Sequence, residues 1–323
     1  MKKMWTGLIC SILIVVTSLY SGKISSFIKE KVSDNRIAVV PNANKYAKDY
    51  DFAFVKLDKD YIPYSYNDLI NVFFTILNSG ATKATFYCPN EYKNCITDVE
   101  KISNDALILT HVNNFIHPYN NFTNIETTIY ESGEITLNIS HVYNIQKIEE
   151  INKAVDDIIN KLYDEEKSDY ENIKSIHDYI INNTKYDQEH KEDNNKYESN
   201  NAYGVIKSNL ATCNGYTDLM AIILSKLNIK NYKIATTPER ISYESLGHVW
   251  NAVYLDNEWV HLDLTWDDPV SESGEDYLYH KYFLVSNEEI AEADFGEVVV
   301  EEHNFDDAIY LEFNDSIKEV ISQ

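Results

Sequence analysis

The sequence predicts an α+β fold, in which a helix that begins at a cysteine packs on an antiparallel sheet and follows a small α/β region. Three patterns support this prediction. An apolar stripe at helical spacing follows Cys213. Two alternating segments, 248–255 and 259–264, flank the turn dipeptide Asp256-Asn257 and indicate a hairpin. Helical and alternating patterns also succeed one another over residues 49–145, as in a sheet with helices on one face.

Composition restricts the classes of protein to which the chain can belong. With 323 residues, 44% hydrophobic and 25% charged, it has room for two domains with sizeable cores and is typical of globular proteins. The formal net charge is −24. This charge argues against a nucleic-acid partner, because phosphates need a basic surface, and against docking on anionic lipid headgroups. We attribute most of the acidity to solubility.

The N-terminus has the pattern of an export signal. Lys2 and Lys3 precede a mostly apolar run from Met4 to Tyr20. The run is short for a membrane span of about 20 residues, but no small-x-small cleavage site follows it. We therefore expect residues 1–22 to be a signal peptide or a retained membrane anchor, with residues 4–20 as the membrane tether in the second case. Residues 23–48 are expected to be a polar tether, and the protein to be extracellular or on the cell surface.

The chain has four cysteines, and their pairing decides which of them can be a free, reactive thiol. Cys10 lies in the N-terminal apolar run, which leaves Cys88, Cys95 and Cys213 for the folded part. Cys88 and Cys95 are close in sequence and can pair if the chain is exported, although spacing alone does not fix the geometry. Whether or not they pair, Cys213 has no obvious partner. A leftover thiol outside the cell is either buried and inert or reactive.

Residues 49–145 predict a small α/β domain of unknown role. We expect helices at 65–78 and 96–102, and a hairpin around Ser132-Gly133. Further strands are expected at 52–55, 84–87 and 106–112. No phosphate-binding loop, metal-ligand spacing or Cys-x-x-Cys pair occurs here, so substrate binding or spacing is the default expectation.

Two helices are expected to lead from this domain into the second one, which we assign to residues 146–323. The first follows the apolar repeat of residues 148–162. The second begins where Ser168 and Glu171 have the spacing of a capping box. His177 on this helix is interpreted as a packed or exposed histidine rather than a ligand. The polar run 188–201 is expected to be a surface loop, with substrate gating as the alternative.

Cys213 is predicted to open a helix that runs to Asn228, with Thr212 as its cap. A thiol at a helix N-terminus faces unpaired backbone N–H groups and the positive end of the helix dipole. Both favour the thiolate, which is the nucleophile. On its own such a cysteine is more often structural, because cysteine is among the most buried residue types. The residues that accompany it therefore decide its interpretation.

The hairpin register predicts that a histidine and a carboxylate meet. If the turn dipeptide closes a two-residue loop, Leu255 pairs with Glu258, and counting back places Trp250 opposite Asp263. His248 shares the face of Trp250, one diagonal step from Asp263. Diagonal Cβ atoms lie about 7–8 Å apart, a gap that an imidazole and a carboxylate can bridge. A slip of one residue would place the two on opposite faces.

These positions predict a Cys213-His248-Asp263 site. The carboxylate would hold the tautomer of His248 and stabilise its protonated form, and the other ring nitrogen would take the proton of Cys213 and later return one to the leaving group. Taken singly, the two partners are more readily a core histidine and a strand-end carboxylate. A zinc site of Cys213, His248, His261 and Asp263 is the lesser alternative, because the tight spacing of structural zinc sites is missing. The predicted mechanism needs no metal and no cofactor.

Three motifs resemble the core of the transglutaminase-like superfamily: Cys-Asn-Gly-Tyr at 213–216, Gly-His-Val-Trp-Asn at 247–251 and Asp-Leu-Thr-Trp-Asp-Asp-Pro at 263–269. The resemblance extends over about residues 165–290. It implies a papain-like fold, with the cysteine helix packed against an antiparallel sheet that carries the histidine and the aspartate. It also implies acyl transfer from an amide through a thioester, either to water, as in a cysteine peptidase, or to an amine, as in protein cross-linking.

The resemblance further implies an oxyanion site built from the backbone N–H of Cys213 and an upstream side chain. Tyr203 is the candidate for that side chain, and Trp250 is a second candidate for contact with the oxyanion or the substrate. No loop of the EF-hand type is present, so calcium dependence is not carried over.

The function expected from these observations is that of an exported thiol enzyme acting on peptide or protein amides, with hydrolysis favoured over cross-linking. A non-catalytic binding module on the same fold is the alternative from another class. The composition, rich in Asn, Ile, Lys and Tyr, is typical of an AT-rich bacterial genome.

Overall fold

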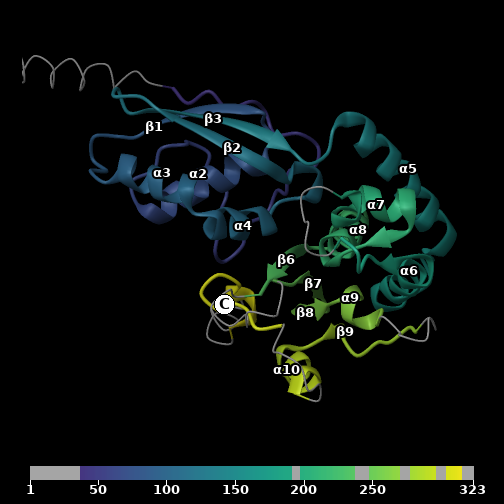
Figure 1. Ribbon diagram of the computed structural model, residues 1–323. Coiled ribbons are helices and arrows are strands. Elements are labelled where there is room, and N and C mark those ends of the chain that lie inside the picture. Colours follow the sequence, from purple (N-terminus) through teal and green to yellow (C-terminus); the bar gives the residue numbers. More distant parts are fainter. Residues whose placement is uncertain (1–36, 191–196, 237–246, 270–276, 296–302, 315–323) are drawn as a thin grey trace, which may run out of the picture.

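A computed structural model describes residues 37–190, 197–236, 247–269, 277–295 and 303–314 (Figure 1). The expectations for the export signal and for the first part of the tether lie outside these residues, as does the middle of the polar loop at 191–196. Within the described part of the chain, no helix combines the length and the apolar character that crossing a membrane requires.

The N-terminal part is a three-stranded antiparallel sheet with helices on one face (Figure 1). The strands lie in the order β1 (Lys83–Tyr87), β3 (Glu134–His141), β2 (Phe122–Ile129). The helices are α2 (Tyr66–Asn78), α3 (Cys95–Asn104) and α4 (Ala106–Asn114), and a short 3₁₀ turn, η1 (Pro118–Asn120), precedes β2. The predicted hairpin is confirmed, since Ile129 pairs with Ile135 across the turn.

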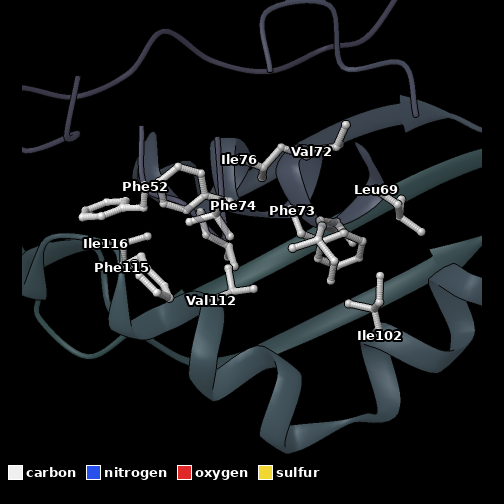
Figure 2. Packing of buried hydrophobic residues seen from close by; sticks show 14 of the residues in the cluster. Phe52, Leu69, Val72, Phe73, Phe74, Ile76, Ile102, Val112, Phe115 and Ile116 are labelled. Atoms are coloured by element: carbon white, nitrogen blue, oxygen red, sulfur yellow. The ribbon is translucent and has the colours of Figure 1, made fainter. Parts of the chain in front are cut away.

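Large apolar side chains of α2 and α4 fill the space next to the sheet (Figure 2). Phe73 and Phe74 of α2 are fully buried, and so is Phe115, which follows α4. Ser65 caps α2 by accepting the N–H of Asp68, and the apolar stripe that predicted this helix is its buried face. Each such phenylalanine contributes roughly 1.5–3 kcal/mol through burial.

Two predicted strands in this part are wrong. Residues 106–112 form α4, because Asp105 at the N-cap accepts the N–H groups of Leu107 and Ile108 and so starts a helix. The apolar run there is too short for its periodicity to separate strand from helix. Residues 52–55 form a tight turn in which the N–H of Phe52 donates to the carbonyl of Val55.

Val39, Asn44 and Lys48 contact the folded part, which corrects the prediction of a tether for the end of residues 23–48. Val39 and Thr85 form an antiparallel bridge at the edge of β1. Lys48 is buried, and its Nζ donates to the carbonyl of Asn231 at 2.6 Å. The polar composition concealed this packing because the buried polar groups are satisfied by hydrogen bonds rather than by water.

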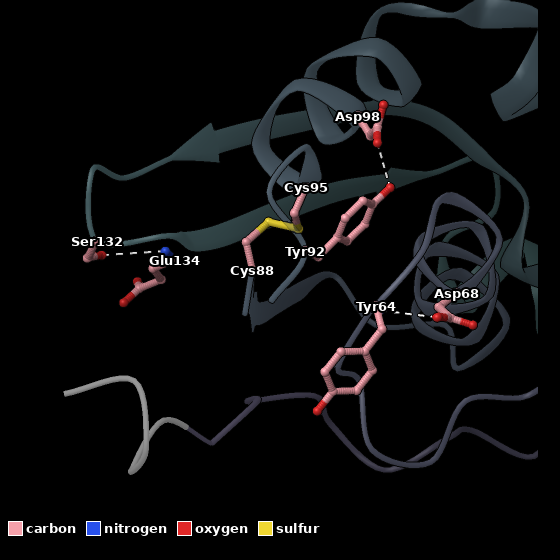
Figure 3. The surroundings of a disulfide bond; sticks show 8 residues. All are labelled: Tyr64, Asp68, Cys88, Tyr92, Cys95, Asp98, Ser132 and Glu134. Atoms are coloured by element: carbon pink, nitrogen blue, oxygen red, sulfur yellow. Dashed lines mark hydrogen bonds between the residues drawn. A yellow bond between two sulfur atoms is a disulfide. The ribbon is translucent and has the colours of Figure 1, made fainter. Parts of the chain in front are cut away.

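Cys88 and Cys95 form a disulfide between the end of β1 and the start of α3 (Figure 3). Their Cα atoms lie 5.6 Å apart. Tyr92, inside the loop that the disulfide closes, donates its hydroxyl to Asp98 of α3 at 2.5 Å (Figure 3). The sequence left open whether Cys88 and Cys95 pair, and in the structure they are paired.

The C-terminal part holds a four-stranded antiparallel sheet and the helices around it. The strands lie in the order β6 (Asn231–Ala235), β7 (Val249–Leu255), β8 (Glu258–Leu262), β9 (Phe283–Val285). The helices are α5 (Ile145–Leu162), α6 (Asp169–Asn183), α7 (Ala202–Ser208), α8 (Cys213–Lys226), α9 (Leu264–Asp267) and α10 (Asn287–Phe295). The smaller pieces are β4 (Lys185–Tyr186), β5 (Leu210–Ala211), η2 (Glu198–Asn200) and η4 (Leu311–Phe313).

The predicted helix starts in this part are confirmed. Ser168 accepts the N–H of Glu171, and the Glu171 carboxylate accepts the N–H of Ser168, so the capping box opens α6. Helix α8 begins at Cys213, as predicted. The predicted α+β class, with the cysteine helix against an antiparallel sheet, is confirmed as well.

The sheet of the C-terminal part is covered on both faces. Val253 and Leu262 belong to the core that contains the apolar side chains of α8. Tyr232, Trp250 and Ala252 belong to the core of the N-terminal part. The N-terminal domain therefore packs directly on the sheet that carries the candidate site.

Candidate active site

Cys213 is the first residue of α8 and the only free cysteine among the described residues. Its side chain is partly exposed. Thr212 occupies the N-cap position, but no side chain caps the helix: the Thr212 hydroxyl donates to Asn200 Oδ1 at 2.8 Å instead of accepting from α8. The predicted capping by the Thr212 side chain is therefore wrong. The first N–H groups of α8 remain available to a negative charge beside the thiol.

Gly215 allows the loop before α7 to lie against the first turn of α8. A Cβ at this position would come within 2.3 Å of the carbonyl oxygen of Ser199. That same carbonyl accepts the N–H of Thr212 at 2.9 Å, and Asn214 Nδ2 donates to Asn200 at 3.1 Å. The close approach of this loop explains the glycine in the Cys-Asn-Gly-Tyr motif.

Two hydrogen bonds at Thr217 fasten the N-terminal half of α8 to β7. The Thr217 hydroxyl donates to the carbonyl of Val249 at 3.0 Å, and Asn251 Nδ2 donates to the carbonyl of Thr217 at 3.1 Å. Thr217 lies one turn after Cys213, on the same side of the helix. The thiol is thereby held at the beginning of β7, where His248 precedes the strand.

The structure brings the three predicted residues together. His248 Nε2 lies 2.5 Å from Asp263 Oδ2, and Cys213 lies close enough to His248 to act on the charge of the imidazole. Because Nε2 faces the carboxylate, Nδ1 is the ring nitrogen left for the thiol. The predicted register is confirmed, since Leu255 pairs with Glu258.

Asp263 uses its two carboxylate oxygens for different purposes. Oδ1 accepts the N–H groups of Thr265 and Trp266 at 2.8 and 3.4 Å, so the residue is also the N-cap of α9. Oδ2 faces His248. A helix cap therefore fixes the orientation of the carboxylate that holds the imidazole.

The buried charges of this pair support each other. Burial alone would lower the pKa of His248, but the charge and hydrogen bond of Asp263, together with those of Cys213, raise this pKa well above its ordinary value. Burial alone would raise the pKa of Asp263, and the charge and hydrogen bond of His248, aided by His303, bring it below its ordinary range. The arrangement thus favours an imidazolium at His248 paired with the Asp263 carboxylate.

His303 is a member of the site that sequence reasoning missed. Its Nε2 lies 2.9 Å from Asp263 Oδ2, and its side chain is 1% exposed. The ring stacks on Tyr282 at 4.8 Å and meets the ring of His248 edge-on at 5.4 Å. No motif surrounds His303 in the sequence, and it lies 40 residues from Asp263, so only the folded chain reveals the contact.

Trp250 has no exposed side-chain surface to offer a substrate, which argues against its prediction as an oxyanion or substrate residue. It is fully buried. Its ring stacks on that of His248 at 5.7 Å, with 14° between the planes, and its Nε1 donates to His261 Nδ1 at 3.0 Å. Trp250 therefore supports the imidazole from inside the protein.

His261 does not join the other residues of the zinc alternative. Its Nδ1 accepts from Trp250, and its ring stacks on Phe313 at 4.0 Å. Burial and the charge of His303 lower the pKa of His261 to about 3. Among the described residues, the side chains near enough to share an ion in this region are instead His248, Asp263 and His303.

Tyr203 is not placed as the predicted oxyanion donor. Its hydroxyl donates to Glu150 Oε2 of α5 at 2.9 Å. A phenol has one O–H proton, and this one is used outside the Cys213 site. Among the described residues, the backbone N–H groups at the start of α8 are candidate donors to an oxyanion.

A polar cavity of about 290 Å³ lies between the N-terminal part and α8. Thr110, Asn113 and Asn121 line it from the N-terminal part, and Asn214 and Asp218 line it from α8. Asn214 follows Cys213 directly in the chain. The N-terminal part thus contributes to a hydrogen-bonding surface next to the residue that carries the thiol.

Comparison with known proteins gives one family match. Residues 156–264 match the family model of the Transglutaminase-like superfamily. Two curated relatives are the "Kyphoscoliosis peptidase" of Mus musculus, 19% identical over 147 residues, and that of Homo sapiens, 20% identical over 144 residues. Each alignment covers 42% of this chain and 22% of the relative, so the chain spans less than a quarter of the length of these proteins.

Two solved structures overlap partly with the chain. One is titled "Crystal structure of a TGase" (TM-score 0.33, 16% identity, 45% of this chain and 44% of that one). The other is a putative cysteine protease from Cytophaga hutchinsonii (TM-score 0.29, 14% identity, 44% of this chain and 61% of that one). Both overlays are too partial to bear on function.

Proposed function

Residues 156–264 form a transglutaminase-like domain, and from this premise we propose that the protein is a thiol enzyme that cleaves or transfers peptide or protein amides through a thioester on Cys213. One observation carries the proposal: a partly exposed thiol at a helix N-terminus without a side-chain cap lies beside a buried histidine, and Nε2 of that histidine faces a carboxylate. A non-catalytic binding module does not need this arrangement. The curated relatives, which are named as peptidases, also support it.

In the first half of the reaction the Cys213 thiolate attacks the carbonyl carbon of the amide. The N–H groups at the start of α8 stabilise the negative charge that develops on the oxygen. The imidazolium of His248 gives its Nδ1 proton to the amide nitrogen, the C–N bond breaks, and an amine leaves. The acyl group then remains on Cys213 as a thioester, and His248 is neutral.

In the second half an acceptor attacks the thioester. His248 takes a proton from the acceptor, the C–S bond breaks, and the thiolate returns beside the imidazolium. Water as acceptor gives a carboxylic acid and completes hydrolysis, whereas a primary amine gives a new amide and completes cross-linking. We favour hydrolysis, because water is the default acceptor at an accessible thioester.

We further propose that the chain is exported and that residues 1–22 are its signal peptide or anchor. The disulfide between Cys88 and Cys95 supports this, because disulfides persist in oxidising compartments outside the cytosol. The polar cavity beside Asn214 supports a peptide substrate that offers hydrogen-bonding groups, and it gives residues 49–145 a part in substrate binding. Protease accessibility of the protein on intact cells would test the location.

Alkylation of the native thiol tests the central proposal. We expect iodoacetamide to label Cys213 near pH 6, and His248→Ala to slow this labelling by about tenfold or more. Cys213→Ala gives the background, because the chain also carries Cys10, which iodoacetamide can label. His190→Ala is the matched control, since His190 also pairs with an aspartate. A thiol that stays unreactive until the protein is unfolded would contradict the proposed enzymatic function and would favour the non-catalytic binding module.

The two acceptors are separated by an incorporation assay. The protein is incubated with a glutamine-containing protein and a labelled primary amine. Fragments without label indicate hydrolysis, and label without fragments indicates cross-linking. Cys213→Ala must abolish either product, because both pass through the same thioester.

A further inference from the structure

A second group of titratable side chains lies where α6 meets the segment before β9. His177 and Asp178 belong to α6, and His280 belongs to the segment. His177 Nδ1 lies 2.9 Å and His280 Nε2 2.6 Å from the same oxygen of Asp178, Oδ1. One ligand atom from each residue lies within 4.8 Å of the other two. Two imidazole nitrogens and a carboxylate thus converge on one point, outside the Cys213 site.

His177 is fully buried between two carboxylates. Its Nδ1 faces Asp178, and its Nε2 lies 3.3 Å from Asp267 Oδ2. Neither Nε2 nor this oxygen has a hydrogen-bond partner within the described ranges. A neutral imidazole carries a single N–H, so whenever His177 is uncharged one of the two carboxylates faces a nitrogen lone pair. Such an unsatisfied contact is costly in a buried place.

A divalent cation at Nδ1 removes this conflict. The ion takes the Nδ1 lone pair, the proton is then fixed on Nε2, and Nε2 can donate to Asp267. Carboxylates commonly orient metal-binding histidines in this way. Two imidazoles and one carboxylate are a ligand set that suits Zn²⁺, with a fourth position left for water.

Lys174 already places a positive charge at the same point. Its Nζ lies 2.9 Å from Asp178 Oδ2 and 2.8 Å from His280 Nε2. The side chains of Lys174 and His280 are 38% and 34% exposed, so both can move without disturbing a core. A Zn²⁺ ion that replaces the ammonium balances the charges of Asp178 and Asp267.

We propose that His177 Nδ1, the Asp178 carboxylate and His280 Nε2 bind a zinc ion, while Lys174 withdraws to solvent. Ligand atoms on tetrahedral zinc lie roughly 3.3 Å apart when the bonds are about 2.0–2.1 Å long, so the exposed His280 shifts outward slightly. The ion ties α6 to the segment before β9. Through Asp267 it also braces α9, which lies beside α6 and is capped by Asp263 (Figure 1).

Zinc binding by the full chain tests this site without any activity measurement. Cys213→Ala serves as the parent protein, because a thiol binds zinc by itself. The metal is removed with a chelator, and zinc is then titrated calorimetrically, with the visible absorption of bound cobalt as a report on coordination. We expect one zinc per chain. Binding should weaken by about tenfold or more in His280→Ala and in Asp178→Asn.

A variant that binds zinc more tightly than the parent distinguishes an effect on the proposed site from a folding defect, because misfolding would only weaken binding. Lys174→Met should bind zinc roughly tenfold more tightly, because it removes the competing charge, whereas Lys167→Met should bind as the parent does. His190→Ala and His303→Ala control for other histidine–aspartate contacts and should also bind as the parent does. The proposal is overturned if the parent binds no zinc, if His280→Ala binds as tightly as the parent, or if only His303→Ala abolishes binding.

Discussion

His303 Nε2 lies 2.9 Å from Asp263 Oδ2, the same oxygen that contacts His248 Nε2. One buried carboxylate oxygen therefore holds two imidazoles, while the other oxygen caps α9. This contact makes His303 a positioning residue for the candidate site, because it helps to orient the carboxylate that faces His248.

Replacing His303 should impair the site without abolishing it. In His303→Phe the Asp263 carboxylate loses one hydrogen bond but keeps its anchor in the cap of α9. We expect alkylation of Cys213 near pH 6 to slow by roughly three- to tenfold, which is less than in His248→Ala. A purely structural role would lower the unfolding midpoint and leave the pH profile of alkylation unchanged. An unaltered rate and pH profile would contradict the positioning role.

Replacing Asp263 should change the pH dependence of the thiol. Asp263 raises the pKa of His248, so in Asp263→Asn the imidazolium is less stable and the thiolate–imidazolium pair forms only at higher pH. The alkylation profile should move toward alkaline pH, and the rate near pH 6 should fall by about tenfold, which corresponds to roughly one pKa unit. Asp256→Asn, in the hairpin turn, is the matched control. If the pH profile of alkylation in Asp263→Asn were identical to that of the wild-type protein, the carboxylate would have no part in the proposed mechanism.

The ion pair of Asp218 and Lys233 should be important for stability. Lys233 Nζ lies 2.9 Å from Asp218 Oδ1, both side chains are 5% exposed, and the Tyr143 hydroxyl donates to the other Asp218 oxygen at 2.7 Å. Lys233→Met leaves the carboxylate buried without its cation, which should lower the free energy of unfolding by about 3–5 kcal/mol. Urea denaturation measures this loss. The double variant Asp218→Asn/Lys233→Met should lose less, and an equal or greater loss would contradict the explanation.

The disulfide should stabilise the N-terminal part. Cys88 and Cys95 are separated by 7 positions in sequence, and closing so short a loop contributes about 2–3 kcal/mol by restricting the unfolded chain. The double variant Cys88→Ala/Cys95→Ala should lose this amount in urea denaturation. A reducing agent should lower the stability of the wild-type protein similarly and leave the variant unaffected. Equal stability of the two oxidised proteins would show that the loop is held by other contacts, such as the Tyr92–Asp98 hydrogen bond.

Much of the candidate site followed from local rules. The turn dipeptide fixes the loop length of the hairpin, and because side chains alternate along a strand, the loop length fixes which residues face each other. That reasoning placed His248 near Asp263, and the structure has them in contact. Cys213 was found in the same way, because a helix start can be recognised from the apolar stripe that follows it.

Other features could not be predicted, because their causes are not local. The apolar run 106–112 fits a strand or a helix equally well, and the cap at Asp105 decided it. Trp250 was expected near the oxyanion or the substrate, but it is fully buried and its ring packs against His303 and Phe305 from the C-terminal segment. Tyr203 was expected at the oxyanion because it precedes Cys213 in the chain, but its hydroxyl donates to Glu150 of another helix.

The sequence by itself determined the helix that Cys213 opens, the hairpin register and the meeting of His248 with Asp263, since spacing and turn length decide these within a short stretch of chain. Only the tertiary structure decided that His303 shares the Asp263 carboxylate, that Trp250 is buried beneath His248, and that His177, Asp178 and His280 converge. These contacts join segments far apart in the chain. Such contacts depend on how whole elements pack, and side-chain periodicity carries no information about that.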